Sequence, residues 1–163
     1  MGKLFPDLVY GRLYDIKLDI LHEKGIKNIL IDLDNTLIRW KANIIDEKTI
    51  EWVNNSKEAG LKLCIVSNSN GNRAQAIAEK LDIKFIKNAA KPFGKGIRRA
   101  MEMLNADKTN TAIVGDQLFT DVLGGNRAGL FTVLLEPIHK DEFFYTKIVR
   151  IFERRKLKSL GLK

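Results

Sequence analysis

Short apolar runs recur along this 163-residue chain, separated by stretches in which apolar residues return every three or four positions. Several of the runs are apolar at consecutive rather than alternate positions, which is typical of parallel strands covered on both faces. Five strands are predicted in this way: Asn28 to Leu33, Leu61 to Val66, Ile83 to Ile86, Thr111 to Gly115 and Phe131 to Leu135. A parallel sheet of about five strands is therefore expected.

The stretches between the runs have helical spacing and end at helix-stop residues. The segment from Asp46 to Ala59 carries Ile50 and Val53 one turn apart and is followed by Gly60, a common helix terminator. Further helices are predicted at Asn72 to Leu81, Gly94 to Leu104 and Gln117 to Ala128. Strands that alternate with helices predict an α/β fold with an open, doubly wound sheet. Active sites of such sheets gather beyond the carboxyl ends of the strands.

The length fits one domain, and no linker or internal repeat divides the chain. Residues 28–135 hold the predicted strands and form the expected core, with residues 1–27 as an N-terminal extension and residues 139–163 as a basic C-terminal helix. No apolar stretch is long enough for a membrane span, and Met1 to Tyr10 lacks the layout of a signal peptide. The single cysteine, Cys64, excludes a disulfide within the chain, so a cytoplasmic location is expected.

Four polar clusters follow four successive predicted strands. Because the carboxyl ends of parallel strands meet at one edge of the sheet, these clusters are expected to share one crevice. They consist of Asp32, Asp34 and Thr36 after the first strand, Ser67 and Asn68 after the second, Lys91 after the third, and Asp116 with Asp121 after the fourth. Their common position predicts a single site built from all four.

The carboxylates of this set suit phosphoryl transfer. Asp32, at the strand end, can displace an alkoxide from a phosphoryl group and form an aspartyl-phosphate that water hydrolyses. Asp34 lies two residues on, where it can protonate the leaving oxygen and then activate water. Carboxylates repel a phosphate dianion, so a hard cation, Mg²⁺ by preference, is expected on Asp32, Asp116 and the backbone carbonyl of Asp34.

The other polar residues complete this hypothesis. Lys91 is expected to neutralise a phosphate oxygen and the nucleophile, while Ser67 and Asn68 bind the phosphate through the hydroxyl and backbone N–H groups. Thr36 and Asp121 are expected to support the site, Asp121 by holding either Lys91 or a water on the metal.

Each cluster alone has an ordinary structural explanation. Asp-x-Asp-x-Thr is also a turn sequence, and Ser67 to Asn70 is also a helix cap. Lys91 alone is most simply a surface lysine with a rival in Lys95, and Asp116 alone is a cap for the helix after it. The order of the clusters, each at a strand end, favours the catalytic interpretation.

In that order, the four clusters resemble the motifs of haloacid-dehalogenase-like (HAD) phosphatases, over roughly Asn28 to Leu135. The resemblance implies a Rossmann-like fold, Mg²⁺ dependence and the residue roles given above. Tyr14-Asp15-Ile16, with Lys24 to Lys27 just before the first motif, resembles the bacterial YqeG type of subclass IIIA, which is similar to the mitochondrial phosphatidylglycerophosphate phosphatases. Arg39 to Gly60 is too short for the cap domain of many relatives, so a capless, open site is expected.

Other functions remain open. Receiver domains of signalling proteins combine similar residues, but their acid pair follows the first strand and their phosphorylated Asp follows the third, which is not the order found here. Nucleic-acid ends are a less favoured substrate, since no nucleic-acid module or interleaved basic and aromatic run is present. A soluble phosphorylated metabolite is a further alternative, and a non-catalytic scaffold is disfavoured because no catalytic position is lost. The sequence does not indicate an oligomeric state.

The basic tail favours a lipid substrate. From His139 to Lys163 there are eight Lys and Arg residues against three Asp and Glu. Apolar residues at helical spacing, Phe144, Ile148, Ile151 and Phe152, lie among the cations Lys147, Arg150, Arg154, Arg155 and Lys156. Such a helix either packs on the core or contacts an anionic membrane surface. The resemblance to the phosphatidylglycerophosphate phosphatases implies the identity of that lipid, and together with the expected open site and the basic tail it makes phosphatidylglycerophosphate at the inner membrane surface the leading substrate hypothesis.

Overall fold

The computed structural model describes residues 3–139, 153–159 and 161. Its strands are β1 (Leu8–Tyr10), β2 (Asn28–Ile31), β3 (Lys62–Val66), β4 (Lys84–Ile86), β5 (Thr111–Gly115) and β6 (Phe131–Leu135). Its helices are α1 (Leu18–Glu23), α2 (Glu47–Glu58), α3 (Asn72–Leu81), α4 (Lys95–Leu104) and α5 (Leu123–Ala128). Shorter 3-10 turns occupy Leu13–Asp15 and Lys108–Asn110, and a π-helical turn occupies Leu118–Val122.

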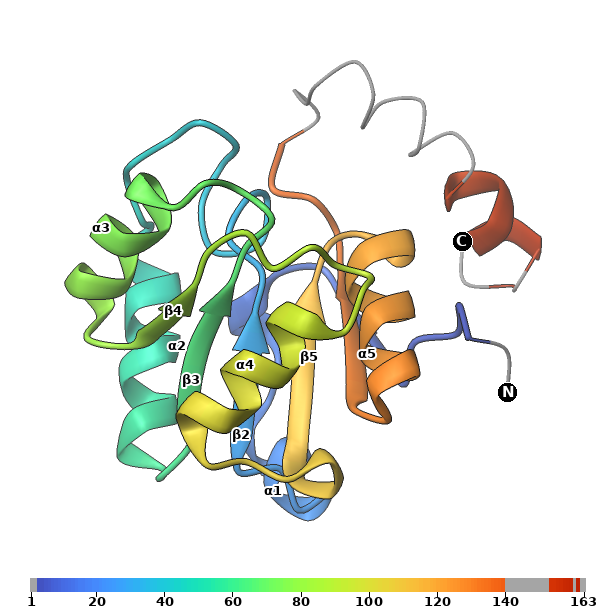
Figure 1. The fold of residues 1–163 in the computed structure, drawn as a ribbon, viewed down its shortest axis with the longest axis horizontal. Helices are drawn as coiled ribbons and strands as arrows, with labels where there is room; N and C mark the ends of the chain where they lie inside the picture. The colour runs from blue at the N-terminus through green and yellow to red at the C-terminus, as the bar shows by residue number, and fades with distance from the viewer. Residues whose placement is uncertain (1–2, 140–152, 160, 162–163) are drawn as a thin grey trace.

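The six strands form one parallel sheet in the order β1-β6-β5-β2-β3-β4 (Figure 1). The chain leaves β2 toward β3 and β4 and then returns to β5 on the other side of β2. The strand order therefore reverses between β2 and β5. In open α/β sheets, the crevice for a ligand lies at this reversal, beyond the carboxyl ends of the strands.

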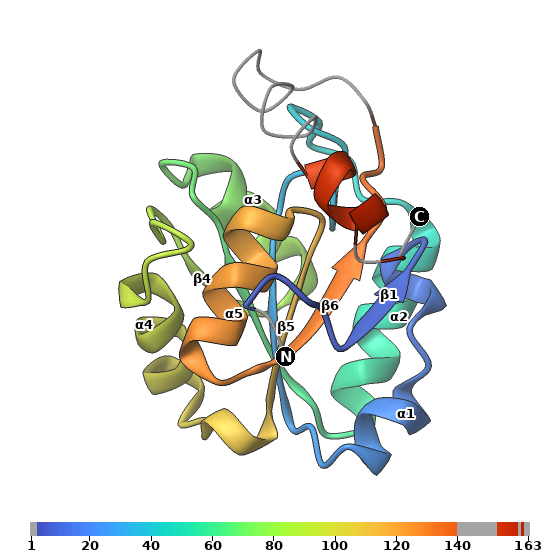
Figure 2. The same ribbon diagram turned by 90° about the vertical axis from the view of Figure 1, so that its right-hand side faces the viewer.

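Helices cover both faces of the sheet, as a doubly wound fold requires. Helices α1 and α2 lie on one side, and α4 and α5 lie on the other (Figure 2). Alternate residues of one strand enter different cores, since Ile29 and Ile31 of β2 pack with α2 and α3, whereas Leu30 packs with α4. These strand residues are fully buried. Burial on both faces explains why the strands are apolar at consecutive positions.

All five predicted strands are confirmed, and a sixth, β1, was missed. Three residues are too few to show a strand period, and the partner of Leu8 in the ladder is Val133, far away in sequence. Asp7 fixes this edge, because its carboxylate accepts hydrogen bonds from the backbone N–H and the hydroxyl of Thr132, at 2.7 and 3.0 Å. The extension before β2 also packs on the core, since the Trp52 indole donates to the carbonyl of Ile16 at 2.8 Å.

The described part of the basic tail forms a helix over 153–159. Leu157 packs against a small core cluster that includes Leu118 and Leu134, and the carboxylate of Glu153 accepts a hydrogen bond from the backbone of Phe119 at 3.1 Å. The exposed residues of this helix include Arg154, Arg155 and Lys156. Six residues of the expected amphipathic pattern lie outside the described residues: Phe144, Lys147, Ile148, Arg150, Ile151 and Phe152. Within the described ranges, no helix has the length and apolar character that crossing a bilayer requires.

Candidate active site

The carboxyl ends of β2 and β5 carry the central acidic residues. Asp32 follows β2, and its backbone N–H continues the ladder by donating to the carbonyl of Val114 at 2.9 Å. Asp116 follows β5 directly, and Asp121 lies in the π-helical turn after it. Carboxylate oxygens of Asp32, Asp116 and Asp121 all lie within 4.8 Å of one another. The reversal point of the sheet thus brings together the three acidic residues that follow its central strands.

Lys91 enters this cluster from the loop between β4 and α4. Its Nζ lies 2.7 Å from Oδ1 of Asp32 and 2.7 Å from Oδ1 of Asp121. Only 2% of the Lys91 side chain is exposed, as is 2% of the Asp121 side chain. Charge-assisted hydrogen bonds of this length at a buried position fix both the ammonium and the carboxylates. The structure therefore brings together Lys91 and the acidic residues predicted from sequence.

The burial of these charges changes their protonation. Loss of hydration raises the pKa of Asp32 to about 7, with Asp121 and Asp34 adding to the rise and Lys91 opposing it. For Lys91, burial acts against the charged form, but the carboxylates of Asp121 and Asp32 raise its pKa above the ordinary value. The ammonium is therefore strongly held. One buried ammonium thus lies beside two of the three clustered carboxylates.

This cluster of carboxylates fits a divalent cation. All three acidic side chains offer oxygen ligands, which Mg²⁺ and similar hard cations prefer. The hydroxyl of Thr36, which is buried, approaches Oδ1 of Asp116 at 3.5 Å. Three convergent carboxylate groups therefore give the site the composition of a divalent metal centre.

Asp34 faces a partner that the sequence analysis missed. Its carboxylate forms an ion pair with the guanidinium of Arg73, in the first turn of α3. The side chains of both residues are 24% exposed. Asp34 thus lies at the open side of the cluster while Asp32 lies at its buried side. The one signal for Arg73 in the sequence was its place just after the Ser67 to Asn70 loop, which also ends at this edge.

Ser67 and Asn68 lie in the loop after β3 and take different positions. The Ser67 hydroxyl is buried and lies 2.9 Å from the Ser69 hydroxyl, and it also accepts from the backbone N–H of Ser69 at 3.1 Å. The Asn68 amide binds the backbone of Lys91 on both sides, accepting from its N–H at 2.8 Å and donating to its carbonyl at 3.1 Å. The Asn68 side chain therefore connects the loop after β3 to the loop between β4 and α4, which carries Lys91 and is called the lysine loop below.

Two small features hold the acidic loops. A Cβ atom on Gly115 would lie 2.2 Å from the carboxyl carbon of Asp121, so only glycine leaves room for this carboxylate. The Oδ2 atom of Asp121 accepts a hydrogen bond from the backbone N–H of Gln117 at 3.1 Å. Asn35 has a positive φ of 60° and connects the first motif to the segment after β6, since its side-chain oxygen accepts from the backbone N–H of His139 at 3.3 Å. Neither role was predicted from sequence, because the first depends on how the π-helical turn folds back on the end of β5 and the second on a contact with a distant segment.

Known proteins resemble this chain over most of its length. The family described as mitochondrial PGP phosphatase matches residues 2–139. A protein named as the probable phosphatase YqeG of Bacillus subtilis is 41% identical over 97% of this chain and 92% of its own length. The phosphatidylglycerophosphate phosphatase 1 of Arabidopsis thaliana is 28% identical over 95% of this chain, which spans 47% of that protein.

Solved structures agree in fold. An uncharacterized protein from Listeria monocytogenes superposes with a TM-score of 0.59 at 20% identity, over 73% of this chain and 85% of its own. The cobalt-bound deoxy-D-mannose-octulosonate 8-phosphate phosphatase of Haemophilus influenzae gives a TM-score of 0.56 at 16% identity, over 85% and 91% of the two chains. With the sheet order and the acidic edge described above, these similarities establish that the chain belongs to the mitochondrial PGP phosphatase family of HAD-type phosphatases and is a phosphoric monoester hydrolase.

Proposed function

We propose that the chain hydrolyses a phosphate monoester with Mg²⁺ by way of an aspartyl-phosphate on Asp32. The observation that carries this proposal is the buried contact of Lys91 with both Asp32 and Asp121 at the reversal point of the sheet. At this position, the Lys91 ammonium can neutralise an oxygen of the incoming phosphate while the Asp32 carboxylate stays in place. Asp32, Asp116 and the backbone carbonyl of Asp34 would hold Mg²⁺, which supplies positive charge to the phosphoryl oxygens when bound.

The reaction divides into two displacements. An oxygen of Asp32 attacks phosphorus, the bond to the ester oxygen breaks, and the leaving alkoxide takes a proton from Asp34. Asp34 then removes a proton from water, which attacks phosphorus, releases inorganic phosphate and restores the Asp32 carboxylate. The open position of Asp34 suits this exchange, since it can reach both the leaving group and solvent. Arg73 fixes the orientation of the Asp34 carboxylate between the two steps.

The remaining residues orient the site. The loop of Ser67 supplies hydroxyl and backbone N–H groups to the phosphate. Asn68 contributes by clamping the lysine backbone, and Asp121 contributes by holding the Lys91 ammonium. Thr36 steadies Asp116. These roles agree with the chemical types of the residues and with their contacts.

Phosphatidylglycerophosphate is the substrate that we propose. The family description and the name of the Arabidopsis relative support it. Among the described residues, only a loop over 32–46 lies between β2 and α2, so no domain is inserted there to cover the site. The exposed cations at 154–156 suit contact with an anionic membrane surface, at the inner leaflet if the chain is cytoplasmic. We treat residues 28–135 as the catalytic core of one domain.

A hydrolysis screen tests the proposal. The purified chain with Mg²⁺ is assayed on detergent-dispersed phosphatidylglycerophosphate, on soluble phosphate monoesters and on phosphorylated nucleic-acid ends. We expect the lipid to be hydrolysed best, activity to vanish with a chelator and return with Mg²⁺, and Asp32→Asn to be inactive while folded. Activity in folded Asp32→Asn would exclude the covalent mechanism. A preference for a soluble ester would exclude the lipid assignment and leave the phosphatase chemistry in place.

A further inference from the structure

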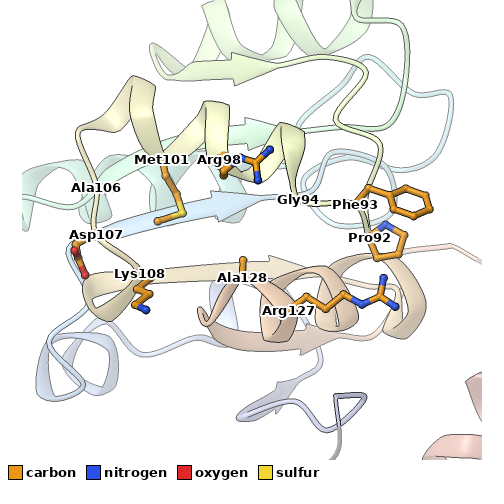
Figure 3. Close-up of a pocket in the computed structure, with 10 residues that line it drawn as sticks. All are labelled: Pro92, Phe93, Gly94, Arg98, Met101, Ala106, Asp107, Lys108, Arg127 and Ala128. Atoms are coloured by element: carbon orange, nitrogen blue, oxygen red, sulfur yellow. The ribbon is translucent and has the colours of Figure 1, made fainter.

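A groove beside the lysine loop runs between α4 and α5, away from the catalytic edge. Its cavity volume is about 630 Å³. Figure 3 shows Pro92 and Phe93 at one end, near the carboxyl ends of the strands, and Asp107 and Lys108 at the other. Pro92 directly follows Lys91, so the catalytic lysine and the groove share one loop. The Phe93 side chain lies at this end and is 70% exposed.

The two helices approach each other closely at the catalytic end. A Cβ atom on Gly124 of α5 would lie 3.1 Å from the Ile97 side chain of α4 and 3.3 Å from the Cα atom of Pro92. Arg98 follows Ile97 on α4, and Arg127 lies one turn after Gly124 on α5. The two arginines therefore stand on facing walls, in the half of the groove near the site, and Figure 3 shows the Arg127 side chain extending toward Pro92.

The charge of the groove is uneven along its length. Among the residues that the structure describes, neither Arg98 nor Arg127 forms an ion pair or a side-chain hydrogen bond. At the far end, Lys108 and Asp107 have opposite charges and attract each other. The catalytic half thus carries two uncompensated positive charges, whereas the far end is balanced. Between them, the groove is lined by the apolar side chains of Met101 and Ala128, and Ala106 lies at the far end beside Asp107 (Figure 3).

We propose that this groove binds one anionic phospholipid, with its phosphodiester between Arg98 and Arg127 and an acyl chain along Met101 and Ala128. Planar guanidinium groups suit phosphate oxygens, and the apolar middle of the groove suits a hydrocarbon chain. The inference rests on the proposed function, because a phospholipid with a terminal phosphate monoester would place that group at Lys91 and its diester, one glycerol unit away, at the arginines. The groove would then select substrates that carry a second phosphate and a chain.

A binding experiment tests the groove apart from catalysis. The probe is dihexanoyl phosphatidylglycerol below its micelle concentration, which has the diester and chains but no monoester. Binding to the full chain is measured by calorimetry. Replacing both arginines (Arg98→Gln with Arg127→Gln) should raise the Kd at least tenfold. The matched control is Lys24→Gln with Lys27→Gln, which removes the same charge from exposed positions before β2 and should change the Kd less than twofold.

Two further arms separate the parts of the ligand. Ala128→Phe fills the middle of the groove without changing charge, so it should weaken dihexanoyl phosphatidylglycerol severalfold and leave the weaker binding of glycerophosphoglycerol, which has no chains, unchanged. Dihexanoyl phosphatidylcholine, with no net charge, should bind more weakly than the anionic lipid. An arginine variant that binds like the lysine control would overturn the proposal, as would stronger binding of an acidic peptide or closure of the groove by a second copy of the chain in sedimentation.

The result is distinguishable from failure of the proposed function. Hydrolysis of p-nitrophenyl phosphate by the wild type reports on the catalytic site alone, so its absence would contradict the phosphatase mechanism and not the groove. If both hold, the ratio of lipid to p-nitrophenyl phosphate turnover should fall at least tenfold in the double arginine variant. An unchanged ratio would show that any lipid in the groove is not the substrate, and would overturn the link between the two sites.

Discussion

Removing the Lys91 ammonium should destabilise the fold far more than removing a lysine whose carboxylate partner is exposed. Lys91 contacts two carboxylates at 2.7 Å, and the Asp121 side chain is only 2% exposed. Lys91→Met keeps the length and apolar stem of the side chain but leaves buried carboxylates without their cation. Breaking a buried ion pair in this way costs about 3–5 kcal/mol. For a chain of this size, the melting temperature should fall by roughly 6–20 °C.

The chain offers a matched control in Lys57. Its ammonium lies 3.6 Å from the carboxylate of Asp82, a side chain that is 96% exposed. Exposed pairs of this kind contribute about 0–1 kcal/mol, so Lys57→Met should lower stability only slightly. The same amino acid is introduced in both variants, and the partner carboxylate is buried in one and exposed in the other. The control also loses a hydrogen bond from the Lys57 ammonium to the carbonyl of Leu81, at 2.9 Å.

Urea unfolding, followed by circular dichroism in the presence of a chelator, measures both variants. The free energy of unfolding is extrapolated to water at constant slope. Adding Asp121→Asn to Lys91→Met should recover part of the loss, because one uncompensated charge is then removed. If Lys91→Met and Lys57→Met cost the same within error, the account of the buried cluster is wrong, and Lys91 is not needed to balance its charge.

Four further predictions concern the site and the core. Asp34→Asn should slow the hydrolysis of alkyl phosphates more than that of aryl phosphates, which need less protonation, and steady-state kinetics on both classes would show it. Arg73→Gln should lower kcat about tenfold by the loss of a fixed Asp34, with no added loss in the Asp34→Asn background if the arginine acts only through that carboxylate. Gly115→Ala should cost about 1–3 kcal/mol in urea unfolding and reduce kcat, because its methyl group overlaps the Asp121 carboxyl. Burial raises the pKa of the Cys64 thiol from 9.0 to about 12, so above pH 9 this thiol loses its proton in the unfolded chain but keeps it in the folded one. The free energy of unfolding should therefore fall as the pH rises from 9 to 11, and Cys64→Ala should make that fall less steep.

Most of the sheet could be predicted because its strands are buried on both faces. Thr111–Gly115 and Phe131–Leu135 begin and end as predicted, since each is a continuous apolar run between polar segments. The predicted helix from Gln117 to Ala128 differs, because a π-helical turn over Leu118–Val122 precedes α5. That turn contains Asp121, whose carboxylate accepts from the N–H of Gln117. Periodicity does not distinguish a local π-helical turn from an α-helix.

Some residues of the candidate site could be predicted from the sequence and others could not, as with the fold. Asp32, Asp116 and Lys91 were predictable, because each follows a recognisable strand and their convergence is a property of parallel sheets. Arg73 was not, because its contact with Asp34 depends on how α3 packs beside the first loop. Phosphate binding at Asn68 stays a prediction, while the two hydrogen bonds of its side chain to the Lys91 backbone were not predictable, because they join two separate loops. Residue type and strand position indicate which groups reach an edge, while tertiary packing decides which of them pair.

The pairing of β1 with β6 has a consequence for the order of folding. Leu8 lies beside Val133, so the first strand of the sheet cannot dock until the last one has been synthesised. Strands β2 to β5 pair among themselves and can form earlier. During that interval, the backbone of β1 has no neighbour, and closing so long a loop slows the step that completes the sheet. The N-terminal edge is therefore the part of the sheet that pairs last during synthesis, and until then the backbone groups of β1 are open to pairing with another strand.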